Sequence, residues 1–173
     1  MTAHATCPRD AVEPMVLRTA SLRIALTMPP LPGWHVISIA SDAAVEAALP
    51  PGWDRVTYVV LSDTATPDAR ACRRIALAAL TARHAGAVGL LVHCEMGLSR
   101  SVGVARALVD VLGCAYDSSR EGNPDVRRLV AEQVRHLQGQ GVGCQTLQST
   151  EPVIHHDCRT PTSGGMHDGL ADI

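Results

Sequence analysis

Hydrophobic positions along the chain follow two periods in turn, the continuous or β-branched runs of strands and the three-to-four-residue spacing of helices. The predicted strands are 34–39, 55–61 and 87–92, with a further strand expected inside 16–28, most strongly at 21–27. The predicted helices are 43–49, 67–85, 101–112 and 124–138. Because strands alternate with helices, we expect an α/β fold in which helices flank a central, mostly parallel sheet.

Several local patterns refine these elements. The strand at 55–61 ends in four apolar residues without alternation, which is typical of a strand buried on both faces. The helix at 101–112 is apolar on nearly every side and therefore belongs inside the domain. Thr66 is expected to cap the helix that starts at Pro67, with Asp68 beside the positive end of the helix dipole, and Asn123 is expected to cap the last helix.

The patterned part of the chain, 15–138, is long enough for a single domain with its own core, since 46% of the 173 residues are hydrophobic. Residues 1–14 have no periodicity and are expected to form a flexible arm. Residues 139–173 are polar and rich in glycine, so we expect a disordered tail. His155, His156 and Cys158 in that tail have no second cluster at a zinc-ligand spacing, and no metal site is predicted.

Charge and cysteine usage narrow the classes of partner. The formal net charge of −2 provides no basic field for nucleic acid or an anionic membrane, and no window approaches the ~18 apolar residues of a membrane span. The six cysteines form no C-x-x-C pair, and no signal-peptide pattern opens the chain. We therefore expect a monomer with free thiols in the cytoplasm.

The chemistry is concentrated in one stretch, 93–101, between the apolar strand at 87–92 and the apolar helix. It reads as a strand, a tight loop and a helix start, in which Cys94 and Arg100 bracket five residues. Amides that converge in such a loop, the positive end of the helix and one guanidinium would together hold a tetrahedral dianion. The same donors would stabilise a thiolate at Cys94. The loop would then carry both a nucleophile and the site for its target.

His-Cys, five residues and Arg-Ser resemble the signature loop of the cysteine-dependent protein tyrosine phosphatases, above all the dual-specificity branch and its small bacterial and phage-type relatives. The resemblance covers about 34–137. It implies that Cys94 attacks phosphorus, that Arg100 and the loop amides bind the phosphate, that Ser101 steadies the departing thiolate and that His93 tunes the thiol. The loop residues whose amides are implied are Glu95, Met96, Gly97, Leu98, Ser99 and Arg100.

A proton donor for the leaving oxygen is also needed, and we predict Asp63. It follows the strand at 55–61, at the sheet edge where ligands of open α/β sheets bind. Leu61-Ser62-Asp63-Thr64 is also similar to the acid-bearing loop of dual-specificity phosphatases. Asp68 is the alternative, although its place at a helix start has a structural explanation, and Asp42 and Asp54 are lesser candidates.

The predicted function is hydrolysis of phosphotyrosine, with phosphoserine and phosphothreonine as further substrates, in phosphorylated proteins or peptides and without a cofactor. Two alternatives stay open: a noncatalytic phosphate-binding module, and a phosphatase for a phosphoinositide, a nucleotide or an RNA 5′-phosphate. His93 has a second interpretation as an ordinary core histidine. The Glu95 carboxylate would repel a dianion if it pointed inward, so its side chain is expected to turn outward.

Overall fold

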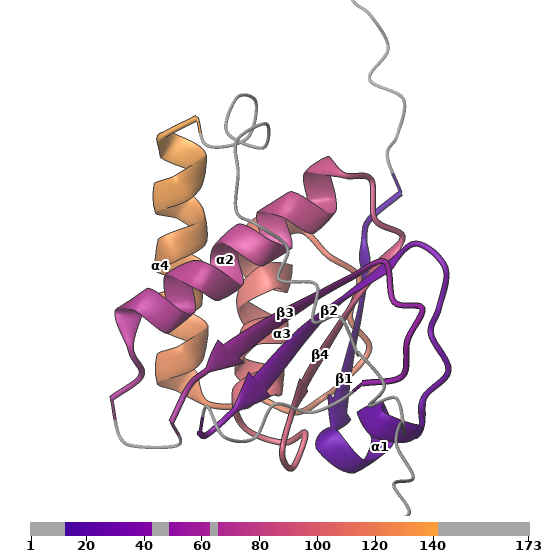
Figure 1. Ribbon diagram of the computed structural model, residues 1–173. Coiled ribbons are helices and arrows are strands. Elements are labelled where there is room, and N and C mark those ends of the chain that lie inside the picture. The colour runs from indigo at the N-terminus through magenta and orange to yellow at the C-terminus, as the bar shows by residue number, and fades with distance from the viewer. Residues whose placement is uncertain (1–12, 43–48, 63–65, 142–173) are drawn as a thin grey trace, which may run out of the picture.

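The computed structural model describes residues 13–42, 49–62 and 66–141. Along the chain the elements are β1 Val16–Ser21, α1 Leu22–Thr27, β2 Trp34–Ala40, β3 Arg55–Val60, α2 Ala69–His84, β4 Gly89–Cys94, α3 Arg100–Leu112 and α4 Pro124–Gly139 (Figure 1). Most of the predicted arm at 1–14, of the helix at 43–49 and of the tail at 139–173 lies outside the described residues, and so does Asp63.

The four strands form one sheet in the order β1-β4-β2-β3, and every pairing is parallel. The expected α/β fold with a parallel sheet is therefore confirmed. β4 lies between β1 and β2, with Ser21 of β1 beside Cys94 and Ser38 of β2 beside His93. The carboxyl end of β4 is thus enclosed by its neighbours, and the loop that follows it leaves from the middle of the sheet edge.

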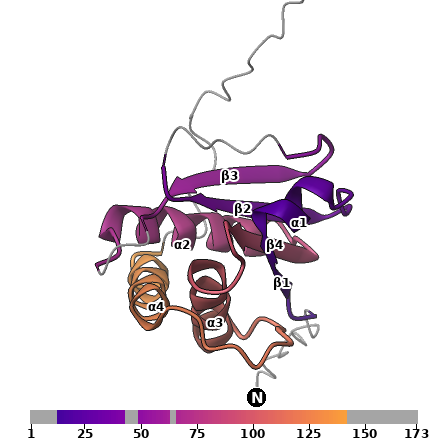
Figure 2. The same cartoon turned by 90° about the horizontal axis from the view of Figure 1, so that it is seen from below.

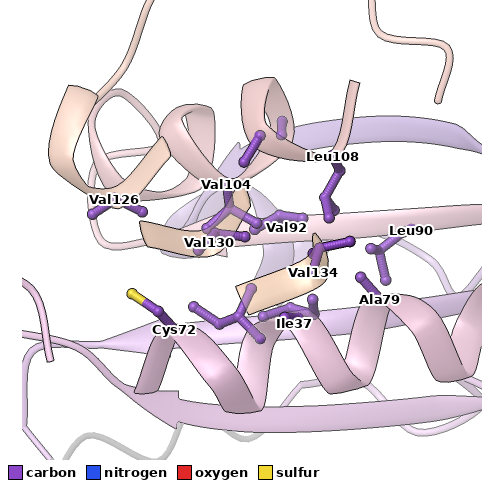
Figure 3. Close-up of a cluster of buried hydrophobic side chains, with 14 of the residues drawn as sticks. Ile37, Cys72, Ala79, Leu90, Val92, Val104, Leu108, Val126, Val130 and Val134 are labelled. Atoms are coloured by element: carbon purple, nitrogen blue, oxygen red, sulfur yellow. The ribbon is translucent and has the colours of Figure 1, made fainter. Parts of the chain in front are cut away.

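Helices α2, α3 and α4 lie on the same side of the sheet (Figure 2). Leu90 and Val92 of β4 point into the core on this side, where they meet apolar residues of all three helices, as Figure 3 shows for Val104 of α3 and Val134 of α4. The opposite face carries a smaller cluster, which contains Ala20, Trp34, Val36, Trp53 and Leu91. Burial on both faces holds β4 rigid. Its end is therefore a firm platform for a functional loop.

The strand expected inside 16–28 is present as β1, but its placement at 21–27 is wrong, because β1 ends at Ser21 and Leu22–Thr27 is helical. The Ser21 hydroxyl caps α1 by accepting a hydrogen bond from the Ile24 amide at 3.4 Å. The Leu22 amide donates to the Glu95 carbonyl at 3.1 Å, beyond the last pair of the β1–β4 ladder. The chain leaves the sheet where β4 ends, and α1 starts against the following loop.

β3 is the edge strand of the described sheet, so the prediction that its end is buried on both faces is also wrong. Val59 is 3% exposed but Val60 is 48% exposed. A strand with one neighbour, next to β2, buries the side that faces the helices and leaves the other side partly open. The apolar run at 58–61 is therefore compatible with an edge strand as well as with a central one.

The bounds of α3 and α4 agree with the sequence to within one residue, whereas α2 starts later than expected. Asp68, not Thr66, is the N-cap: its carboxylate accepts hydrogen bonds from the amides of Arg70 at 3.0 Å and Ala71 at 3.2 Å. Asn123 caps α4 as predicted. Across the described ranges, no helix has the length and apolar character needed to span a membrane.

Candidate active site

The loop that joins β4 to α3 forms the candidate site. Cys94 is the last residue of β4 and is 2% exposed, and Arg100 is the first residue of α3 and is 4% exposed. Both side chains are therefore held at the boundary of the core. The five intervening residues form the turn that brings the start of α3 over the end of β4.

The Cys94 sulfur receives hydrogen bonds that stabilise its thiolate. The Gly97 amide donates to Sγ at 3.2 Å, and the Ser101 hydroxyl lies 3.3 Å from it. Burial by itself would raise the pKa of Cys94, but the hydroxyl and amide of Ser101, the Gly97 amide and the charge of Arg100 outweigh it. The pKa of the thiol is lowered from its ordinary value. The population of the nucleophilic thiolate rises accordingly.

Arg100 is anchored to the carboxyl ends of two neighbouring strands. Its Nη1 donates to the Ser41 hydroxyl at 2.9 Å, just past β2, and to the Leu61 carbonyl at 2.7 Å, just past β3. Its Nη2 pairs with the carboxylate of Glu95. These contacts fix the plane of the guanidinium group above the same sheet edge as the thiol.

The side chain of Glu95 does not turn away from the site, contrary to the expectation from the sequence. One carboxylate oxygen pairs with Arg100, and the other accepts a hydrogen bond from the Ser41 amide at 2.9 Å. The expectation considered only repulsion by a dianion, whereas the Arg100 cation attracts the carboxylate toward the loop.

Ser41 is a site residue that sequence reasoning missed. Its hydroxyl accepts from Arg100 and its amide donates to Glu95, so it touches both charged side chains of the loop. The sequence contained one signal: Ser41 lies just after the strand predicted at 34–39, and parallel strands place their carboxyl ends at one edge.

Gly97 allows the loop to pass close to β1. Its φ is +69°, and a Cβ atom there would lie 2.5 Å from the Ser21 nitrogen and 2.6 Å from the Ala20 carbonyl carbon. A side chain at this position would meet backbone, which cannot move aside easily. Glycine is required both for the conformation and for the space.

The segment before α4 holds the other end of the loop. The Asn123 amide donates to the Ser99 carbonyl at 3.0 Å, and Gly103 of α3 donates to the same oxygen at 2.9 Å. A Cβ atom at Gly122 would lie 2.3 Å from the Gly103 nitrogen. The backbone of 122–123 therefore packs directly on the first turn of α3 and fixes the point from which Arg100 projects.

His93 is a neutral histidine beneath the loop. It is 1% exposed, and burial lowers its pKa to about 4. Within the described part of the chain, neither ring nitrogen has a hydrogen-bond partner. The order of the loop therefore comes from the backbone contacts of Glu95 and Ser99 and not from a described hydrogen bond of the His93 ring.

Of the predicted acids, Asp63 lies outside the described residues, two positions after the Leu61 carbonyl that binds Arg100. Asp68 caps α2 with both carboxylate oxygens, which favours its structural interpretation. Asp54 precedes β3 and so lies at the amino ends of the strands, opposite the thiol. Among the described residues, no group of three or more histidine, cysteine or acidic side chains could hold a metal ion.

No family model and no curated protein sequence matches the chain. Two solved structures are similar to it. The crystal structure of PTPMT1 in complex with PI(5)P is 14% identical, with 73% of this chain and 94% of that chain covered and a TM-score of 0.45. The crystal structure of human tyrosine phosphatase-like serine/threonine/tyrosine-interacting protein is 18% identical, with 73% and 91% covered and a TM-score of 0.43. The functional assignment therefore rests on the site itself.

Proposed function

We propose that this protein is a cysteine-dependent phosphatase that hydrolyses phosphomonoesters through a cysteinyl-phosphate intermediate. The observation that carries the proposal is the state of the Cys94 sulfur, buried between the Gly97 amide and the Ser101 hydroxyl with a lowered pKa, in a loop that ends at Arg100. A structural cysteine in a core has a raised pKa, as Cys72 does at about 11.

In the first step the Cys94 thiolate attacks phosphorus in line, so that a sulfur–phosphorus bond forms as the bond to the leaving oxygen breaks. The Arg100 guanidinium and the amides of residues 95–100 stabilise the charge that spreads over the equatorial oxygens. Asp63 gives its proton to the leaving oxygen, which then departs as an alcohol or phenol.

In the second step water attacks the phosphocysteine and Asp63, now a carboxylate, takes a proton from it. The sulfur leaves as a thiolate and phosphate is released. The Ser101 hydroxyl, 3.3 Å from the sulfur, donates a hydrogen bond to this thiolate. The reaction needs no cofactor.

The substrate class we propose is a phosphorylated protein or peptide, with phosphotyrosine as the main target and phosphoserine and phosphothreonine as further targets. A phenol is a better leaving group than an alcohol and so depends less on the acid. We propose that the protein acts as a monomer in the cytoplasm. A phosphoinositide, nucleotide or RNA 5′-phosphate substrate would use the same loop and the same two steps.

The second candidate is a phosphate-binding module without turnover. The pairing of Glu95 with Arg100 favours it, because an anion already contacts the group that would stabilise the transition state. The bond between Ser101 and the sulfur favours the enzyme, since phosphate binding alone does not require a stabilised thiolate.

The decisive experiment is hydrolysis of a small aryl phosphate by the purified chain, compared with Cys94→Ser, Asp63→Asn and Asp68→Asn. We expect Cys94→Ser to lose turnover and to keep phosphate binding. Asp63→Asn should lose most activity, because the leaving oxygen then departs without a proton. Asp68→Asn is the matched control, because asparagine caps a helix as well as aspartate does but carries no proton to donate.

A loss of activity in Asp68→Asn with activity retained in Asp63→Asn would assign the acid to Asp68. A wild-type protein that binds phosphate but releases none from an aryl phosphate would be the binding module and not the enzyme.

A further inference from the structure

The Arg100 guanidinium is engaged by acceptors on two of its edges. Nη1 contacts neutral groups at the ends of β2 and β3, the Ser41 hydroxyl at 2.9 Å and the Leu61 carbonyl at 2.7 Å. Nη2 contacts a charged group, the Glu95 carboxylate. The neutral contacts anchor the side chain, whereas the charged contact lies on an edge that could also face an anionic ligand.

The Glu95 carboxylate binds as a phosphate group would. One of its oxygens contacts a guanidinium nitrogen and the other accepts a backbone amide, that of Ser41, at 2.9 Å. A guanidinium group together with backbone amides is the donor set that phosphate anions require. An internal anion therefore occupies an edge of the Arg100 guanidinium that the proposed substrate needs.

This anion can leave without disturbing the loop. The backbone of Glu95 is held separately, since its carbonyl accepts the Leu22 amide at 3.1 Å. Its side chain is 32% exposed, whereas that of Arg100 is 5% exposed. Rotation about the side-chain bonds of Glu95 would carry the carboxylate into solvent, while Arg100 and the loop amides stay in place.

We propose that Glu95 is an internal ligand of the phosphate site, which a phosphate group must displace from Arg100 before it can bind productively. The proposal gives Glu95 a role in the proposed function, and it rests on that function for the identity of the ligand, a phosphate group. A carboxylate and a dianion on one guanidinium edge repel each other, so the two states exclude one another. The apparent affinity for phosphate is then reduced by the fraction of molecules in which Glu95 occupies the site.

The test uses the full chain with Cys94→Ser, which keeps the loop and prevents covalent chemistry. In this background Glu95→Gln removes the charge, while the amide oxygen can still accept hydrogen bonds from Ser41 and Arg100. Glu132→Gln is the matched control, because Glu132 forms an exposed ion pair with Arg128 at 3.2 Å on α4. The measurement is the dissociation constant of inorganic phosphate by calorimetry at fixed ionic strength.

We expect Glu95→Gln to bind phosphate about tenfold more tightly, a change of about 1.4 kcal/mol, and Glu132→Gln to stay within about twofold of the parent. Unchanged or weaker binding in Glu95→Gln would overturn the proposal, because a residue that merely orients Arg100 would give that result. Equal tightening in both variants would also overturn it, since net charge would then be the cause.

The outcome is separable from that of the proposed function. If the wild-type chain fails to hydrolyse aryl phosphates but Glu95→Gln tightens phosphate binding, the enzyme is refuted and the internal ligand is supported. If the enzyme is active and Glu95→Gln does not tighten binding, the internal ligand alone is refuted. Absence of phosphate binding in every variant would refute both.

Discussion

The hydroxyl oxygen of Ser101 lies 3.3 Å from the sulfur of Cys94, and both this hydroxyl and the Ser101 amide lower the pKa of the thiol. One residue in the first turn of α3 thus supplies two of the interactions that oppose the effect of burial on the thiol. The helix that buries its apolar sides in the core thereby carries the stabilising donors to the nucleophile.

Ser101→Ala removes one of these donors and should raise the pKa of Cys94. We expect alkylation of Cys94 by iodoacetamide to become severalfold slower near neutral pH, with the pH profile displaced to higher pH, because a hydrogen bond to a charged group contributes about 1.5–3 kcal/mol. The measurement is the alkylation rate across pH, followed by mass spectrometry of the modified peptide. Ser118→Ala, which removes a hydroxyl near Arg120, is the control. An identical profile in wild type and Ser101→Ala would contradict the role given to this hydroxyl.

Gly97→Ala should damage the loop more than its backbone angle alone predicts. Gly113 has a similar φ, +66° against +69°, but a Cβ atom there would meet nothing within 4 Å. Gly113→Ala therefore reports the cost of the left-handed conformation, about 1–2 kcal/mol. Gly97→Ala adds the clash with Ala20 and Ser21.

The free energy of unfolding in urea measures this difference. We expect Gly97→Ala to lose more stability than Gly113→Ala, or to shift the loop and lose phosphate binding while Gly113→Ala keeps it. If the two variants lost equal stability and both bound phosphate normally, the close approach to β1 would have no energetic importance.

The strand–loop–helix unit could be predicted from the sequence because its signals are long and agree with one another. The apolar run before His93 is long enough to form a strand. The apolar helix that follows the loop has Gly113 at its end, where the structure also ends α3. The short spacing between Cys94 and Arg100 then predicts that both residues lie at the ends of the same loop. Local pattern was sufficient for this unit because its strand, loop and helix follow one another directly along the chain.

Other features depend on the order of strands in space, which local pattern does not encode. Val60 has the composition of a buried strand residue, but β3 lies at the edge of the described sheet. Ser41 reaches Glu95 and Arg100 because β2 is the neighbour of β4, although 54 residues separate Ser41 from Glu95 along the chain. The predicted strand at 21–27 failed for a related reason: Ile24 and Thr27 favour a strand, but β4 offers no further pairing beyond Ser21.

His93 should make the stability of the protein depend on pH. Burial lowers its pKa from 6.5 to about 4, so between these values the unfolded chain takes up a proton that the folded chain does not. The contribution of the neutral His93 ring to the free energy of unfolding is fully present above about pH 6.5. It is lost as the pH falls toward 4, by roughly 3 kcal/mol at that lower limit.

We expect His93→Leu to remove this part of the pH dependence, because leucine does not titrate. The measurement is the free energy of unfolding at pH 7, 6 and 5 for wild type, His93→Leu and His136→Asn, which changes an exposed histidine of α4. A difference between wild type and His93→Leu that stays constant over this range would show that the buried ring is not protonated on unfolding.

Arg100→Lys tests whether the planar fork matters or the positive charge alone suffices. The arginine reaches the Ser41 hydroxyl and the Leu61 carbonyl through Nη1 and Glu95 through Nη2, in one fixed plane. A lysine ammonium is a single point of charge and cannot keep these anchors while it presents two parallel donors to a phosphate. We expect kcat/KM for an aryl phosphate to fall by at least about 100-fold, about 2.8 kcal/mol of lost transition-state stabilisation.

Arg128→Lys on the surface of α4 is the control, and there the change should stay within about twofold, because exposed ion pairs contribute little. Retention of most activity in Arg100→Lys would mean that the loop amides bind the phosphate without the guanidinium, and that the anchoring by Ser41 and Leu61 serves the fold and not the reaction.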